Sequence, residues 1–136
     1  MLKLFLDTNI VMDFLDENRQ EHTKAAYLFS LAYEKVIDLY CSSLTYGTIS
    51  YLLHRQKLTT NEIISKLKAL NVICKATNVD DDIVKLSLHS EFKDFEDALQ
   101  YFSALKNDCG MLITRNKQDF VLYDIKILTP DEFFNR

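Results

Sequence analysis

Short apolar runs and helical apolar stripes alternate along the whole chain. The run from Leu2 to Leu6 ends at the carboxylate Asp7 and is typical of a buried strand. Similar runs predict strands over residues 38–41, 72–75, 111–114 and 125–128. Elsewhere apolar residues recur three and four positions apart, which predicts helices over residues 8–15, 21–34, 80–89 and 95–106, and others that begin near Ser43, Thr59 and Pro130. Strands that alternate with helices form a parallel sheet covered on both faces.

The scarcity of turn residues supports an α/β fold. The 136 residues include only two glycines and one proline, whereas an all-β protein needs many tight turns. No linker, repeat or low-complexity segment interrupts the pattern, so we expect a single domain over residues 1–136.

The composition limits where the protein acts and what it binds. No apolar stretch approaches the roughly 20 residues of a membrane span, and Met1 to Asp7 is too short and too soon charged for a signal peptide. The three cysteines form no CxxC pair, which favours reduced thiols in a cytoplasmic protein. The net charge of −4 argues against binding nucleic acid by charge alone. Carboxylates that hold cations would also make the charge more negative, so a nuclease is not excluded.

Polar side chains follow two of the expected strands, at the sheet edge where α/β proteins bind ligands. Asp7 follows the first strand, and Thr114, Asn116 and Asp119 follow the strand at 111–114. In one interpretation, Asp7 or one of its two polar neighbours only caps the next helix. Capping accounts for one polar residue better than for three in a row, so we favour a functional Asp7.

A second acidic motif stands at the start of the helix at 95–106. Asp94 and Asp97 are three residues apart and share one helix face, where they repel each other unless a cation or proton lies between them. They also suit a helix start, with Asp94 as the N-cap and Asp97 beside the positive end of the helix dipole. Both interpretations can hold together. Glu96 is expected to face solvent.

Other charged residues receive structural interpretations. Arg115 and Lys117 can meet a phosphate backbone, but a turn with a solvated charge cluster is favoured. Asp13 is expected on a solvated helix face, and the acids at 80–82 are expected to begin a helix.

Three segments together resemble the PIN domain family. They are Leu6-Asp7-Thr8-Asn9-Ile10-Val11, Asp94-Phe95-Glu96-Asp97-Ala98-Leu99-Gln100, and Thr114-Arg115-Asn116 with Asp119-Phe120. The resemblance implies a three-layer α/β/α sandwich with a central, mainly parallel sheet. It also implies cleavage of RNA that depends on Mg²⁺ or Mn²⁺. Many small bacterial members are toxins of toxin–antitoxin pairs, inhibited by the C-terminal segment of a partner.

The resemblance also assigns roles by position. Asp7 and Asp97 match two family acids, Asp94 resembles an extra acid of some branches, and all three are expected to act as catalytic metal ligands. The family usually carries a Glu where this chain has Thr48, and an acid where it has Asn116, with Asp119 nearby. Because a hard cation prefers charged oxygen ligands, the set of three favours a single metal ion.

The sequence therefore predicts a metal-dependent endoribonuclease that acts on single-stranded or loop RNA and has an antitoxin partner. Its water- or substrate-orienting residues are expected to be Thr8, Asn9, Thr48, Thr114, Asn116 and Asp119. One alternative is a catalytically weak or inactive module that binds RNA or an antitoxin-like peptide. A phosphatase with Asp7 as nucleophile ranks last, because Asn9 replaces the second Asp of that chemistry. Aromatic-rich stretches at 40–53 and 101–105 suggest a homodimer.

Overall fold

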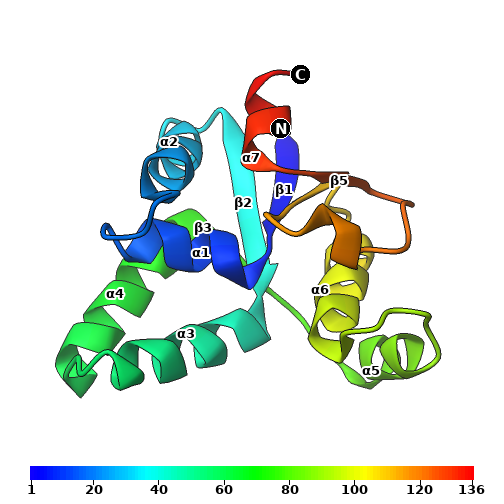
Figure 1. Cartoon of the computed structure of the whole chain (residues 1–136), viewed down its shortest axis with the longest axis horizontal. Helices are drawn as coiled ribbons and strands as arrows, with labels where there is room; N and C mark the ends of the chain where they lie inside the picture. The colour runs from blue at the N-terminus through cyan, green and yellow to red at the C-terminus, as the bar shows by residue number, and fades with distance from the viewer.

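The computed structural model describes residues 1–136 and contains a five-stranded, entirely parallel sheet (Figure 1). The strands are β1 (Leu2–Leu6), β2 (Ile37–Ser42), β3 (Cys74–Thr77), β4 (Met111–Ile113) and β5 (Lys126–Leu128). The helices are α1 (Thr8–Leu15), α2 (His22–Tyr33), α3 (Ser43–Arg55), α4 (Thr60–Ile73), α5 (Asp81–Leu88), α6 (Phe95–Lys106) and α7 (Pro130–Phe134), with a 3-10 turn, η1 (Lys117–Asp119). The alternation expected from the sequence is confirmed. None of the helices combines the length and the apolar character that crossing a bilayer requires.

The two faces of β1 belong to different hydrophobic clusters, because successive side chains of a strand point to opposite sides. Leu4 and Leu6 pack with apolar residues of α1, α2, α3 and α4. Phe5 packs with apolar residues of α5 and α6. Figure 1 shows these two groups of helices on opposite sides of the sheet. The expected α/β/α sandwich is therefore confirmed.

The strand order β3-β2-β1-β4-β5 creates a crevice at one edge of the sheet. After β1, the chain adds β2 and β3 on one side and then crosses over to add β4 and β5 on the other. The point between β1 and β4 is thus a topological switch point, where open α/β sheets bind ligands beyond the carboxyl ends of their strands. Asp7 and Thr114 directly follow these two strands, so the fold brings together residues far apart in sequence.

One strand boundary differs from the sequence-based expectation. The strand expected at 72–75 runs from Cys74 to Thr77, because α4 continues through Ile73. Val72 lies in the last turn of that helix with an exposed side chain. No glycine or proline stands between helix and strand to mark the boundary.

The aromatic stretches proposed for a dimer face have different environments. Tyr101 is fully buried and Phe102 is largely buried within the cluster beneath α6, so they serve the protein's own core. In the other stretch Tyr51 is exposed. A homodimer stays a prediction.

Replacing Thr59 by Ala should lower the free energy of unfolding by about 1 kcal/mol. The Thr59 hydroxyl accepts a bond from the Glu62 backbone N–H at 3.2 Å, and the Glu62 carboxylate accepts one from the Thr59 backbone N–H at 2.9 Å. The substitution removes one half of this capping box. Urea denaturation measures the change, with Ser65→Ala at an exposed position of the same helix as the control. Equal midpoints for Thr59→Ala and the wild type would contradict the assignment.

Candidate active site

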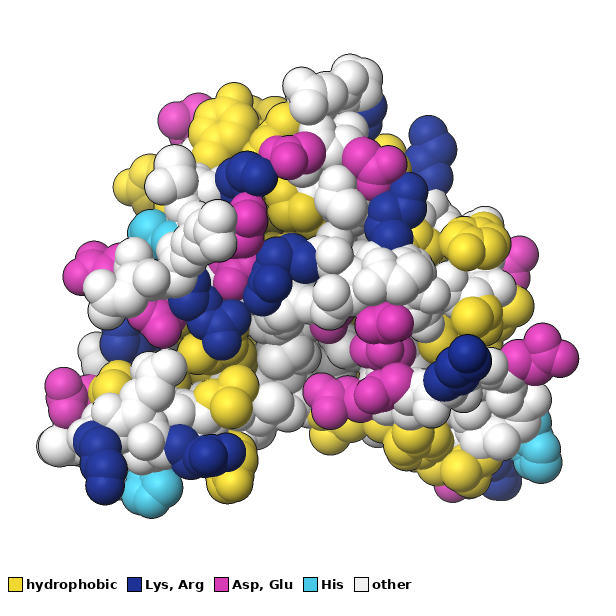
Figure 2. Space-filling view, in the orientation of Figure 1, with side chains coloured by type: hydrophobic (Ala, Val, Ile, Leu, Met, Phe, Trp, Pro, Cys, Tyr) yellow, Lys and Arg dark blue, Asp and Glu magenta, His cyan; other side chains and the backbone are white.

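A polar pocket of about 350 Å³ lies at the switch point. Its lining comes from the start of α1, the start of α6 and the loop after β4, with contributions from Arg19 and Leu52. Asp7, Asp94, Glu96 and Asp97 supply four carboxylates to this one space. In Figure 2 a hollow near the centre of the face has Asp and Glu side chains on one side and Lys and Arg side chains on the other.

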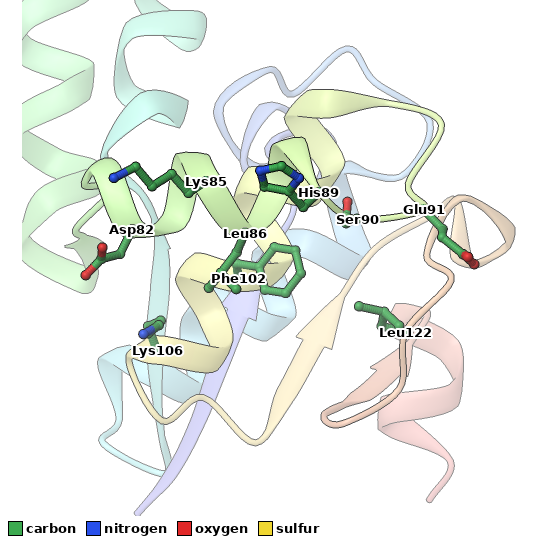
Figure 3. A pocket seen from close by; sticks show the side chains of 9 residues that line it. All are labelled: Asp82, Lys85, Leu86, His89, Ser90, Glu91, Phe102, Lys106 and Leu122. Carbon is green, nitrogen blue, oxygen red and sulfur yellow. The ribbon is translucent and has the colours of Figure 1, made fainter.

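A larger pocket of about 620 Å³ lies beside α5 and α6 (Figure 3). Its two acidic side chains, Asp82 and Glu91, lie at opposite ends of it, and Leu86 and Phe102 occupy its middle. Because no polar groups converge there, its size alone does not make it a site for chemistry. The smaller acidic pocket is the stronger candidate.

Asp7 is held rigidly with its side chain directed to the pocket. Its backbone N–H donates to the Ile113 carbonyl at 3.0 Å, and the Thr114 hydroxyl donates to the Asp7 carboxylate at 2.7 Å. Asp7 occupies the N-cap position of α1, but its side chain makes no capping bond. Burial raises the pKa of Asp7, while hydrogen bonds from Thr114 and Gln100 and the charge of Arg115 oppose that rise. Helix capping therefore does not explain this carboxylate.

The acids at the start of α6 confirm the helix-start interpretation, while a cation between them stays a prediction. Asp94 caps the helix, because its carboxylate accepts a bond from the Asp97 backbone N–H at 3.0 Å. Burial raises the pKa of Asp97 to about 7, with further contributions from the negative charges of Asp7, Asp94, Asp119 and Glu96. A carboxylate that its neighbours repel in this way suits a cation between them.

Several residues expected to orient water or substrate lie around Asp7. The Thr8 and Thr45 hydroxyls are 2.9 Å apart, and the Thr8 backbone N–H donates to Gln100 at 3.1 Å. Asn9 lines the pocket, and its buried Oδ1 has no hydrogen-bond partner. Asn116 lines the pocket too, and its backbone N–H donates to the Thr114 hydroxyl at 3.0 Å.

Two expected residues lie less directly at the site. Thr48 is half-buried on α3 and Asp119 is exposed in η1, and neither contributes to the pocket lining. Asp119 is still near enough to raise the pKa of Asp97. Thr45, one turn before Thr48, is the α3 residue in contact with Thr8.

The structure adds contributors that the sequence-based selection missed. Gln100 lies one helical turn after Asp97, so its spacing from a chosen acid could have identified it. Glu96 is exposed as expected, yet it lines the pocket, and burial together with Asp94 and Asp7 raises its pKa. Arg19 precedes α2, in a segment where no periodicity links it to the site.

The expectation of a solvated Asp13 was wrong. Its side chain is only 2% exposed and pairs with the guanidinium groups of Arg115 at 2.8 Å and Arg19 at 3.2 Å. Asp13 lies three residues after the buried Ile10 and therefore on the inward face of α1. Arg115 belongs to this ion pair and not to a solvated cluster. Lys117, in contrast, makes an exposed ion pair with Glu132 at 3.0 Å, as a solvated charge would.

The donor chemistry of the pocket fits a hard divalent cation. Carboxylate and amide oxygens are the preferred ligands of Mg²⁺ and Mn²⁺, and the partnerless Asn9 Oδ1 adds a buried acceptor. No three acidic, His or Cys side chains lie close enough to form a complete metal site by themselves. Mg²⁺ keeps several of its waters and is commonly held by one or two carboxylates, so wider spacing is compatible with it.

Fold and pocket together define a parallel α/β protein with carboxylates gathered at the switch point of its sheet. Residues 3–118 match the family model described as PIN domain, and the chain belongs to that family. It is 31% identical over 137 aligned residues to "Ribonuclease VapC1" of Aquifex aeolicus, a match that spans 98% of this chain and 94% of the relative.

Solved structures share the fold at low sequence identity. VapBC2 from Rickettsia felis, bound to a DNA fragment from its promoter, superposes with a TM-score of 0.67 at 18% identity over 93% of this chain and 97% of the other. A toxin–antitoxin complex from Klebsiella pneumoniae superposes with a TM-score of 0.65 at 22% identity, over 93% of this chain and 97% of the other. VapC20 of Mycobacterium tuberculosis, described as a Sarcin-Ricin loop cleaving toxin, superposes with a TM-score of 0.62 at 18% identity. The match covers 80% of this chain and 86% of the other.

Proposed function

We propose that this protein is a metal-dependent endoribonuclease and the toxin of a toxin–antitoxin pair. The observation that carries the proposal is the convergence of Asp7, Asp94 and Asp97 in one pocket at the switch point of the sheet. The curated relative is named a ribonuclease, and the structural neighbours include toxin–antitoxin complexes.

Asp7, Asp97 and Asp94 would hold one Mg²⁺ or Mn²⁺ ion, in part through water. Such an ion lowers the pKa of bound water and offsets charge on phosphoryl oxygens. Asp94 is exposed and would accept a proton from the attacking water through the oxygen that does not bind the Asp97 backbone N–H. Thr114 positions Asp7 through its hydrogen bond of 2.7 Å and does not itself face the substrate.

The remaining polar groups would orient water and substrate. Asn9 offers an acceptor with no protein partner, and Asn116 lines the same pocket from the loop after β4. Thr8 is held at two points, by the contact of its hydroxyl with that of Thr45 and by its backbone N–H, which donates to Gln100. Thr48 and Asp119 would act from the edge of the pocket.

The proposed substrate is single-stranded or loop RNA in the cytoplasm. An open pocket lined by carboxylates admits an unpaired backbone more easily than a duplex. One of the structural neighbours is described as a Sarcin-Ricin loop cleaving toxin. The proposed protein partner is an antitoxin, as in the neighbouring complexes.

Cleavage of a mixed single-stranded RNA pool tests the proposal. We expect the purified protein, freed of any bound inhibitor, to cut RNA with Mn²⁺ or Mg²⁺ and to stop when EDTA is added. Single-stranded DNA of the same base sequence serves as the comparison substrate. A calorimetric titration with Mn²⁺ should show a single binding site.

A second candidate is a PIN-fold module that binds RNA or an antitoxin without cutting. Two observations favour it: Thr48 stands where the family usually has Glu, and the acids form no complete metal site by themselves. If a folded, inhibitor-free protein cuts nothing while Thr48→Glu restores metal-dependent cleavage, the binding module is the correct function of the natural sequence.

A further inference from the structure

The two guanidinium groups beside the acidic pocket are held in an unusual way. Asp13 is almost fully buried, and both of its oxygens bind arginine. Arg115 uses Nε at 2.8 Å and Nη2 at 3.4 Å, while Arg19 uses Nη1 at 3.2 Å. The two arginines come from different segments, so one buried carboxylate fixes both.

This geometry leaves strong donors unused. Arg115 meets Asp13 side-on, so its Nη1 donates to no protein group. The Nη2 of Arg19 likewise has no hydrogen-bond partner, and its Nε lies 3.9 Å from Asp16. The side chains of Arg19 and Arg115 are 34% and 37% exposed. A guanidinium group with rigid orientation and spare N–H donors is suited to bind an anion with two oxygens.

The unused donors belong to the same pocket as the carboxylates. Arg19 and Arg115 line it together with Asp7, Asp94 and Asp97. Arg115 and Asn116 also line a second, adjoining polar pocket of about 310 Å³, where Lys24 pairs with Glu21 and Asp131. Arg115 therefore lies between the two pockets, and the cation of the second pocket is already paired.

We propose that Arg115 and Arg19, oriented by Asp13, bind a backbone phosphate of the RNA strand next to the bond that is cut. The inference rests on the proposed function and names how its substrate is held. Arg115 and Arg19 contact the substrate, and Asp13 is a positioning residue. A net charge of −4 gives no general attraction for RNA, so phosphate binding must come from a local group of this kind.

The observations favour RNA over an acidic segment of a partner protein. A phosphodiester offers two non-bridging oxygens to a guanidinium fork, and a strand bound there enters the pocket that the carboxylates of the proposed cleavage site also line. If Arg115 bound a protein carboxylate instead, the acids across the pocket would have no role in the complex.

Two measurements test the proposal: the anisotropy of a short labelled single-stranded RNA in EDTA, where no cutting occurs, and cleavage kinetics with Mn²⁺. We expect Arg115→Ala to weaken RNA binding about tenfold and to raise KM more than it lowers kcat. The slope of log affinity against log salt should fall by about one. Arg115→Lys keeps the charge but loses the side-on fork, so its RNA affinity should lie between those of the wild type and Arg115→Ala. Arg136→Ala removes the same charge from a side chain stacked on Phe133, and it should change neither RNA binding nor the cleavage kinetics.

Asp13→Asn separates orientation from charge. It makes the neighbourhood of the pocket more positive, so binding by charge alone would become tighter. Binding that depends on oriented guanidinium groups would become weaker by about threefold or more. A thermal melt establishes that the variant is folded, and Arg115→Lys provides the same comparison if it is not.

The outcomes separate this proposal from the proposed nuclease. If the wild type cuts RNA and Arg115→Ala binds and cuts equally well, the phosphate site is wrong and the nuclease stands. The expected ligand of Arg115 is then a carboxylate of a partner protein. If the wild type binds RNA through Arg115 but never cuts it, the phosphate site stands and the nuclease fails. If the wild type neither binds nor cuts RNA, both are wrong.

Discussion

Replacing Asp7 by Asn is expected to lower kcat/KM for metal-dependent RNA cleavage by at least about 100-fold, equivalent to about 2.7 kcal/mol of transition-state stabilisation. The amide has nearly the shape of the carboxylate, and its oxygen can still accept the Thr114 hydroxyl bond. What it lacks is the negative charge that holds a cation. The measurement is initial cleavage rates across a range of Mn²⁺ concentrations.

The loss should not come from unfolding. Burial raises the pKa of Asp7, which means that its charge costs the folded protein free energy. The variant should therefore be at least as stable as the wild type in thermal melts. Asp108→Asn is a matched control, since Asp108 is exposed just before β4, at the other end of the strands, and its φ of 59° suits Asn equally. An Asp7→Asn protein with more than a tenth of wild-type activity would remove Asp7 from the catalytic residues.

The main acids could be predicted from the sequence because each follows or begins a well-marked element. The apolar run before Asp7 identifies a buried strand, and the position after such a strand is where α/β sheets bind ligands. Asp94 and Asp97 stand at a helix start that capping preferences mark independently. The sequence did not show that β4 lies beside β1, but the order of alternating strands and helices made one shared edge the natural expectation.

Apart from Gln100, whose spacing from Asp97 is visible in the sequence, the residues that were missed depend on contacts between segments distant in sequence. Asp13 looked like a surface carboxylate because its partners, Arg19 and Arg115, come from a turn and from a loop 102 positions away. Thr45 was passed over for Thr48, since family position and not contact guided that choice. Side-chain pairing across loops has no period along the chain, so no pattern of apolar residues can indicate it.

Asp97 leads to a second large effect, on stability in the absence of metal. Its pKa is raised to about 7, from about 3.9 in an unfolded chain. The folded state therefore binds the proton more tightly, and stability is lost as the pH rises from about 4 through 7. In EDTA at pH 8, Asp97→Asn should raise the free energy of unfolding by about 1–2 kcal/mol after solvent screening, and Tm by about 4 °C or more.

Three comparisons define this expectation. At pH 5 the wild type has lost only about a third of this stability, so the two melting temperatures should lie closer together than at pH 8. Saturating Mg²⁺ should stabilise the wild type far more than Asp97→Asn, because only the wild type retains the ligand charge. The exposed change Asp108→Asn should leave all three melting temperatures unchanged. A wild type that is as stable at pH 8 in EDTA as Asp97→Asn would mean that the acids do not repel one another, and the argument for a cation between them would lose its electrostatic basis.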